Sequence, residues 1–138
     1  MKLNLRHAVV SFFLIFSAGN SFSQLENEAD SIDITMRHCI DTAFGTYGDI
    51  MCIDDAIIAW DHELNNAYQQ LMKEIPADQQ ELLKTSQRAW IQYRDQELEW
   101  MTAYYSRQGS SWGYTIAYRN LEIIRTRTLE LRHYLGDY

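Results

Sequence analysis

The sequence predicts an all-α protein, an up-down bundle of about three long helices whose N-terminal segment is pinned by a disulfide. Beyond residue 45, apolar side chains recur at steps of three and four, the spacing of one helix face. A proline and a glycine–serine stretch divide this pattern into three parts. No strand-like alternation stands out after residue 23. Helices joined by short turns pack most simply as antiparallel neighbours.

The first predicted helix begins near Thr46 and ends at Pro76, the only proline. Thr46 and Asp49 resemble a capping box, in which two side chains satisfy free backbone N–H groups at a helix start. The expected buried stripe comprises Ile50, Ile53, Ile57, Trp60, Leu64, Tyr68, Leu71 and Ile75.

The second predicted helix runs from about Asp78 to Arg107, and the glycine and serines at 109–111 end it. Its stripe comprises Leu83, Trp90, either Tyr93 or Arg94, Leu98, Met101 and Tyr105. The third runs from about Trp112 to Leu135. Its stripe comprises Ala117, Leu121, Ile124, Thr128, Leu131 and Leu135.

The N-terminal residues have the layout of a secretory signal. A short basic start precedes an apolar run over 8–19, and small residues precede Gln24. The apolar run is too short for a comfortable transmembrane span, so we expect cleavage after residue 23 and no stable membrane anchor afterwards. Residues 24–38 form an acidic leader that we expect to be flexible, with room for a short helix. Residues 39–138 then form one helical domain in the periplasm or outside a bacterial cell.

The charge balance excludes one class of partner and favours another. Residues 24–138 hold 10 basic and 19 acidic side chains, a net charge of −9. This argues against nucleic-acid binding, which needs a basic face. It favours basic partner proteins, because opposite fields accelerate encounter.

The two cysteines, Cys39 and Cys52, form an even and closely spaced pair. In an oxidising compartment such a pair predicts one disulfide. A metal site needs more ligands than these thiols and nearby His38 provide. Paired cysteines also leave no free thiolate nucleophile. We expect no metal or other cofactor.

No residue pattern supports an enzyme. His62 and Glu63 begin like a zinc-protease motif, but position 66 is Asn where the second histidine ligand should be. Acidic side chains adjacent on one helix diverge, so they do not converge as glycosidase carboxylates must. No serine occupies a Gly-x-Ser-x-Gly turn. We therefore expect a binding protein rather than a catalyst.

Five polar residues form a candidate network: Asp61, Asn65, Arg94, Asp95 and Arg127. Asp61 and Asn65 share a helix face because they are four apart. An arginine near a core seam needs a partner, because an unpaired buried charge is costly. One interpretation is an inter-helix ion pair of Asp61 with Arg94 or Arg127. The other is contact of these residues with a ligand or partner.

Aromatic residues gather around the junction of the second and third helices. The candidate partner surface comprises Trp100, Tyr104, Tyr105, Trp112 and Tyr114. Tyrosine and tryptophan are favoured at protein interfaces. The alternative is a small hydrophobic cluster beneath the connecting loop.

The motifs together resemble the lysozyme-inhibitor family LprI, a periplasmic helical family. The most specific piece is Gln87-Arg88-Ala89-Trp90-Ile91-Gln92-Tyr93-Arg94-Asp95. The other pieces, in the same order as in the family, are Cys39, Cys52, Asp61, Leu64, Asn65, Tyr68, Arg127 and Leu131. One departure is that family members usually carry a further cysteine pair, absent here near Leu98 and in the last helix. The second and third predicted helices must then hold together by packing.

The resemblance implies a periplasmic or secreted protein that binds a basic lysozyme-like partner and inhibits it. The alternative is an envelope or stress-related module that binds another periplasmic protein. The resemblance transfers no inhibitory loop residue by residue, and the sequence leaves the oligomeric state open.

Overall fold

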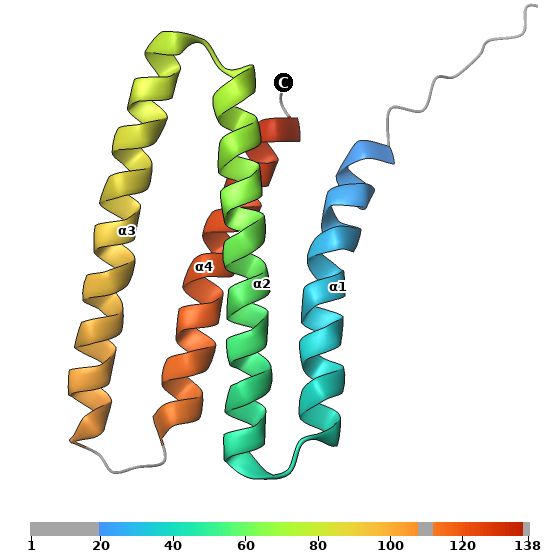
Figure 1. Cartoon of the computed structure of the whole chain (residues 1–138), viewed down its shortest axis with the longest axis vertical. Helices are drawn as coiled ribbons and strands as arrows, with labels where there is room; N and C mark the ends of the chain where they lie inside the picture. Colours follow the sequence, from blue (N-terminus) through green and yellow to red (C-terminus); the bar gives the residue numbers. More distant parts are fainter. Residues whose placement is uncertain (1–19, 108–111, 137–138) are drawn as a thin grey trace, which may run out of the picture.

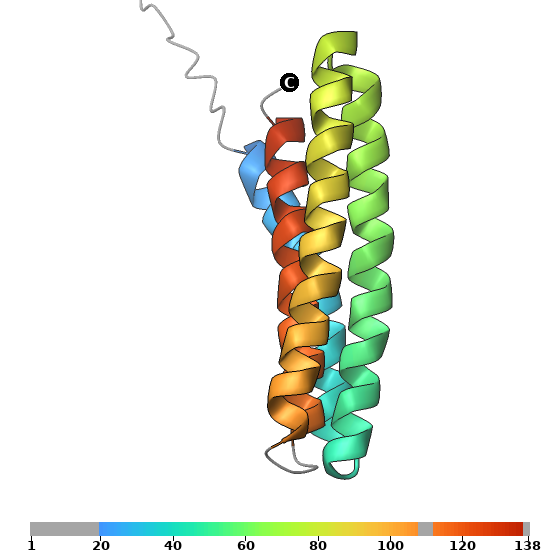
Figure 2. The ribbon, with the colours of Figure 1, turned by 90° about the vertical axis from the view of Figure 1, so that its left-hand side faces the viewer.

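A computed structural model describes the backbone of residues 20–107 and 112–136, and the side chains from residue 31 onward within those ranges. The described residues form four helices and no strand: α1 (Asn20–Thr42), α2 (Gly45–Glu74), α3 (Ala77–Ser106) and α4 (Gly113–Gly136). Successive helices run antiparallel, so α2 and α4 point the same way (Figure 1). All four follow one long axis (Figure 2). The predicted all-helical class is confirmed.

The expected number of long helices was one too few. Residues 24–38, which were placed in a flexible leader, belong to α1, which continues to Thr42. The physical reason is an apolar face with steps of four, because Ile32, Met36 and Ile40 pack against the buried core. The abundance of acidic residues masked this face. The predicted signal peptide lies mostly outside the described residues and stays a prediction.

The three other helices begin and end within two residues of their predicted bounds. The capping box at Thr46 is wrong: Phe44 occupies the N-cap of α2 and its side chain caps nothing. The turn depends on Gly45, whose φ of +70° lies in the left-handed region that suits glycine. Only Ala43 and Phe44 separate α1 from α2.

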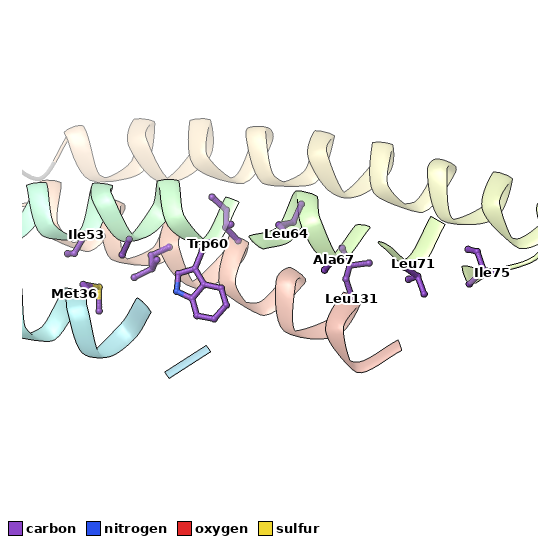
Figure 3. Packing of buried hydrophobic residues seen from close by; sticks show 11 residues of the cluster. Met36, Ile53, Trp60, Leu64, Ala67, Leu71, Ile75 and Leu131 are labelled. Atoms are coloured by element: carbon purple, nitrogen blue, oxygen red, sulfur yellow. The ribbon is translucent and has the colours of Figure 1, made fainter. Parts of the chain in front are cut away.

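The hydrophobic core lies along the seam between α2 and α4, with α1 covering one side (Figure 3). Most buried residues of α2 and α4 fall on the predicted stripes, but five buried residues do not: Cys52, Ala56, Ala67, Arg127 and Arg132. In contrast, Gln87 and Met101 are the only residues of α3 that are fully buried. Of the two alternatives on the α3 stripe, Arg94 is half-buried and Tyr93 is exposed. α3 is therefore the least embedded of the helices whose side chains are all described.

Trp60 of α2 joins three helices at the centre of this core. Its indole Nε1 donates a hydrogen bond to Asp33 Oδ1 of α1 at 3.1 Å. Asp33 also accepts from Arg125 Nε of α4 at 2.8 Å, and the Arg125 guanidinium lies 5.5 Å from the Trp60 ring centroid. The Thr128 hydroxyl donates to the Trp60 carbonyl at 3.3 Å. One buried indole therefore positions α1 and α4 against α2.

Replacement of Asp33 tests this junction. We expect Asp33→Ala to lower the free energy of unfolding by about 1–3 kcal/mol, because the buried indole N–H loses its acceptor. Asp33→Asn should lower it less, since the amide oxygen still accepts. Urea unfolding measures both. Asp41→Ala, at an exposed position of the same helix, is the control and should stay within about 0.5 kcal/mol of wild type. An equal loss for Asp33→Ala and Asp41→Ala would contradict the assignment.

The predicted disulfide is confirmed, and the N-terminal segment that it holds is itself a helix. Cys39 lies in α1 and Cys52 in α2, with their Cα atoms 5.7 Å apart. It fixes the two helices close to their connection.

We expect the double variant Cys39→Ser, Cys52→Ser to unfold more readily under oxidising conditions, by about 3 kcal/mol, because the unfolded chain regains the freedom of an open loop. Thermal unfolding with and without reductant measures the change. Wild type with reductant should approach the variant, and the variant itself should not respond. An unchanged melting temperature in the variant would show that the disulfide does not stabilise the fold.

Candidate functional site

A groove between α2 and α3 gathers most of the motif residues. It has a volume of about 480 Å³. Its lining residues are Asp61, Leu64, Asn65 and Tyr68 from α2, and Lys84, Gln87, Arg88, Trp90, Ile91 and Arg94 from α3. Residues far apart in the sequence therefore meet on one surface, because α2 and α3 form an antiparallel hairpin (Figure 1).

Four of the five predicted network residues lie together at this groove. The Asn65 amide donates to the backbone carbonyl of Asp61 at 2.8 Å and to its carboxylate at 3.1 Å. Arg94 donates to Asp95 Oδ1 through Nε at 2.9 Å and NH2 at 2.8 Å. Arg94 NH1 lies 3.9 Å from Asp61 Oδ1, and its guanidinium lies 5.4 Å from the Trp90 ring centroid. Arg94 therefore forms a long ion pair with Asp61 across the two helices and two short hydrogen bonds with its sequence neighbour Asp95.

Arg127, the fifth predicted residue, lies apart from that group. Its Nε donates to Gln87 Oε1 at 3.0 Å and its NH1 to Glu130 Oε2 at 3.0 Å. NH2 lies 3.4 Å from the Ser86 hydroxyl. Of the two ion pairs considered for Asp61, the structure therefore forms the one with Arg94. Arg127 instead holds α4 to α3, through a glutamine of the motif.

The groove is lined by more cations than anions, but two of its three cations are paired with carboxylates that lie beside the groove. Lys84, Arg88 and Arg94 line it, with Asp61 as the one acidic lining residue. Lys84 is engaged by Glu81, at 2.6 Å, and this hydrogen bond is the main cause that lowers the pKa of the Glu81 carboxyl. A single lining carboxylate cannot supply the pair of carboxyl groups that glycosidases typically use. The groove offers recognition by charge, amide and aromatic groups.

The candidate partner surface divides into two parts. Four of its rings form a continuous chain, with centroids 5.5 Å apart for Trp100–Tyr104, 5.1 Å for Tyr104–Tyr105 and 4.8 Å for Tyr105–Trp112. Trp100 is 60% exposed and Tyr104 is 48% exposed. Tyr114 instead stacks on Tyr118 and lines a hollow between α1 and α4.

Sequence reasoning did not single out several residues that matter. Asp33 and Arg125 were overlooked because their relation to Trp60 spans three helices. Glu63 was considered only as part of an incomplete zinc-protease pattern, yet it accepts a hydrogen bond from the buried Arg132. Phe44 was also overlooked, although it lies off every apolar stripe and precedes a glycine, both signs of an exposed turn.

Two further features bear on the kind of site. Within the described ranges, no three side chains of His, Cys, Asp or Glu come close enough together to hold a metal ion. The same part of the chain contains no helix that is both long and apolar enough to cross a membrane.

The fold and these sites define a disulfide-linked helical bundle with surfaces suited to recognition. The chain belongs to the lysozyme inhibitor LprI family, whose model matches residues 26–131. It is also similar to a solved structure described as a putative uncharacterized protein from Burkholderia thailandensis, with 34% sequence identity and a TM-score of 0.71. That match covers 78% of this chain and 54% of the other, so this chain matches about half of a longer protein. No curated protein sequence matches the chain.

The contact between Gln87 and Arg127 gives a stability prediction. We expect Gln87→Met to lower the free energy of unfolding by about 1–3 kcal/mol, because the buried guanidinium of Arg127 loses an acceptor. Arg94→Met is the matched control, since its ion pairs are partly exposed, and should cost at most about 1 kcal/mol.

Urea unfolding of Gln87→Met, Arg127→Met and the double variant completes a cycle that isolates the pair. The double variant should be more stable than the sum of the single losses implies. Strict additivity, or a larger loss for Arg94→Met than for Gln87→Met, would contradict a structural role for this contact.

Proposed function

We propose that this protein is a secreted or periplasmic binding protein that inhibits lysozyme-type wall hydrolases by covering part of their surface. Membership of the lysozyme inhibitor LprI family is the observation that carries the proposal. The layout of residues 1–23 supports export. We propose no catalytic step, and inhibition then follows from occupancy alone.

The charge of the chain supports a basic target. The full sequence has a formal net charge of −7. Attraction between an acidic inhibitor and a basic enzyme raises the rate of encounter and disfavours acidic competitors. Lysozymes are typically basic, so the acidic chain would attract them.

The exposed rings of Trp100 and Tyr104 are the proposed contact area. They present apolar surface without being needed in the core. Rings of this type bury large area on binding and lose little conformational entropy. Trp100 contacts Tyr104, and Tyr104 contacts Tyr105, which stacks on Trp112; these contacts restrict the orientation of the two exposed rings before a partner arrives.

A second candidate is a non-enzymatic envelope or stress-related module that binds another periplasmic protein. The groove between α2 and α3 supports it, because this groove gathers residues of the most specific sequence motif on one surface. Under this alternative the motif residues face the partner.

Titration of the purified chain into egg-white lysozyme tests the first proposal. We expect a Kd below about 1 µM at low salt, weaker binding at moderate salt because charges are screened, and inhibition of cell-wall lysis at matching concentrations. An absence of binding at low salt would reject the lysozyme proposal. Affinity capture with periplasmic extract would then address the second candidate.

Replacement of the exposed rings tests the contact area. We expect Trp100→Ala with Tyr104→Ala to raise the Kd for lysozyme at least tenfold, equivalent to about 1.4 kcal/mol of lost binding energy. Tyr134→Ala is the control, because Tyr134 is also 48% exposed but lies near the far end of α4. Calorimetry measures each Kd. Equal affinities for the two variants would exclude this surface as the contact.

A further inference from the structure

The connection between α1 and α2 presents an aromatic side chain with no protein environment. Phe44 is 100% exposed, and Tyr47, one turn on, is 76% exposed. Met51 on the same helix is also exposed. A fully exposed phenylalanine contributes no burial to folding, whereas its transfer from water into an apolar hollow would be favourable. Burial of the Phe44 ring against a partner would therefore contribute favourable binding free energy.

The turn is held in one shape by several constraints. The disulfide between Cys39 and Cys52 ties the helices on both sides of it. The backbone N–H of Ala43 donates to the Ile40 carbonyl at 3.2 Å. The chain then enters α2 at Gly45, the residue after Phe44, with a φ of +70°. A ring presented on a rigid turn loses less entropy on binding than one on a mobile loop.

The charges around the ring select the kind of partner. Residues 41–55 contain four aspartates, Asp41, Asp49, Asp54 and Asp55, and neither lysine nor arginine. The nearest basic groups in the preceding sequence are Arg37 and His38. Acidic residues that flank an apolar tip in the sequence, here called the charged rim, suit a partner hollow bordered by basic side chains and disfavour an anionic membrane surface.

We infer that Phe44 is an anchor that inserts into a hollow on a basic partner protein, with Tyr47 and Met51 covering the margin and the aspartates facing the partner's cations. The inference rests on the proposed function for its choice of partner, a lysozyme-type enzyme. It adds a second contact to the rings of Trp100 and Tyr104, because the α1–α2 turn and the C-terminal part of α3 lie at the same end of the bundle (Figure 1).

The test compares Phe44→Ala with Leu82→Ala in the otherwise intact chain, using calorimetric titration into egg-white lysozyme. Leu82 is a matched control, because it is 72% exposed but lies near the α2–α3 connection at the opposite end. We expect Phe44→Ala to raise the Kd at least tenfold, because the variant lacks the aromatic anchor. A tenfold change in Kd corresponds to about 1.4 kcal/mol of binding free energy. Leu82→Ala should change it less than about twofold. Neither variant should alter the melting temperature, since neither side chain is packed.

A second arm tests the charged rim. Asp41→Asn with Asp49→Asn should slow association at low salt and reduce the salt dependence, while leaving the dissociation rate nearly unchanged. Surface plasmon resonance with lysozyme immobilised separates the two rates. An unchanged association rate would remove the rim from the inference.

The outcomes separate this inference from the function on which it rests. Binding by wild type with equal Kd values for Phe44→Ala and Leu82→Ala would overturn the anchor and leave the inhibitor proposal standing. No binding by wild type would overturn both. Sedimentation velocity and flotation with anionic lipid vesicles complete the set. Self-association or vesicle binding that is lost in Phe44→Ala would assign the ring to a second copy or to a membrane instead.

Discussion

The arrangement of the bundle depends on Trp60 and the polar groups that satisfy it. A buried indole needs an acceptor for its N–H, and here that acceptor comes from α1, as Asp33. Asp33 is in turn held by Arg125 of α4. A displacement of either outer helix would leave a buried donor or a charge without its partner, which costs more than the contact itself contributes. The network thereby specifies one arrangement of α1, α2 and α4, where apolar packing alone would tolerate several.

α3 stands outside that network, and its composition explains why. Of its side chains, Gln87 and Met101 alone are fully buried, and the two cysteines of the chain join α1 to α2, not to α3. The hydrogen bond from Arg127 to Gln87 therefore supplements the packing between α3 and α4. Helices with few buried apolar contacts open at a smaller free energy than the core. Among the helices whose side chains are all described, the one that carries the most specific motif is thus also the one expected to open most easily.

Helical spacing predicted α2, α3 and α4 well because their stripes are long and the breaks between them are sharp. α1 was missed because its face of Ile32, Met36 and Ile40 is short and set among acidic residues, and it becomes a helix face only against the core. The same limit applied to the polar residues. Spacing placed Asp61 and Asn65 on one face, but the choice between Arg94 and Arg127 depended on the relative rotation of three helices, which periodicity within one helix does not encode.

The separation of core from recognition surface has a functional consequence. The exposed rings Phe44, Tyr47, Trp100 and Tyr104 share one end of the bundle and leave the junction at Trp60 to hold the fold. The motif groove between α2 and α3 lies along the side, and its cations Lys84 and Arg94 are paired with Glu81 and Asp95. Under the proposed function, the aspartates near the α1–α2 turn would attract a basic partner to that end of the bundle. Side chains at the end can change with the partner while the network that defines the fold stays intact.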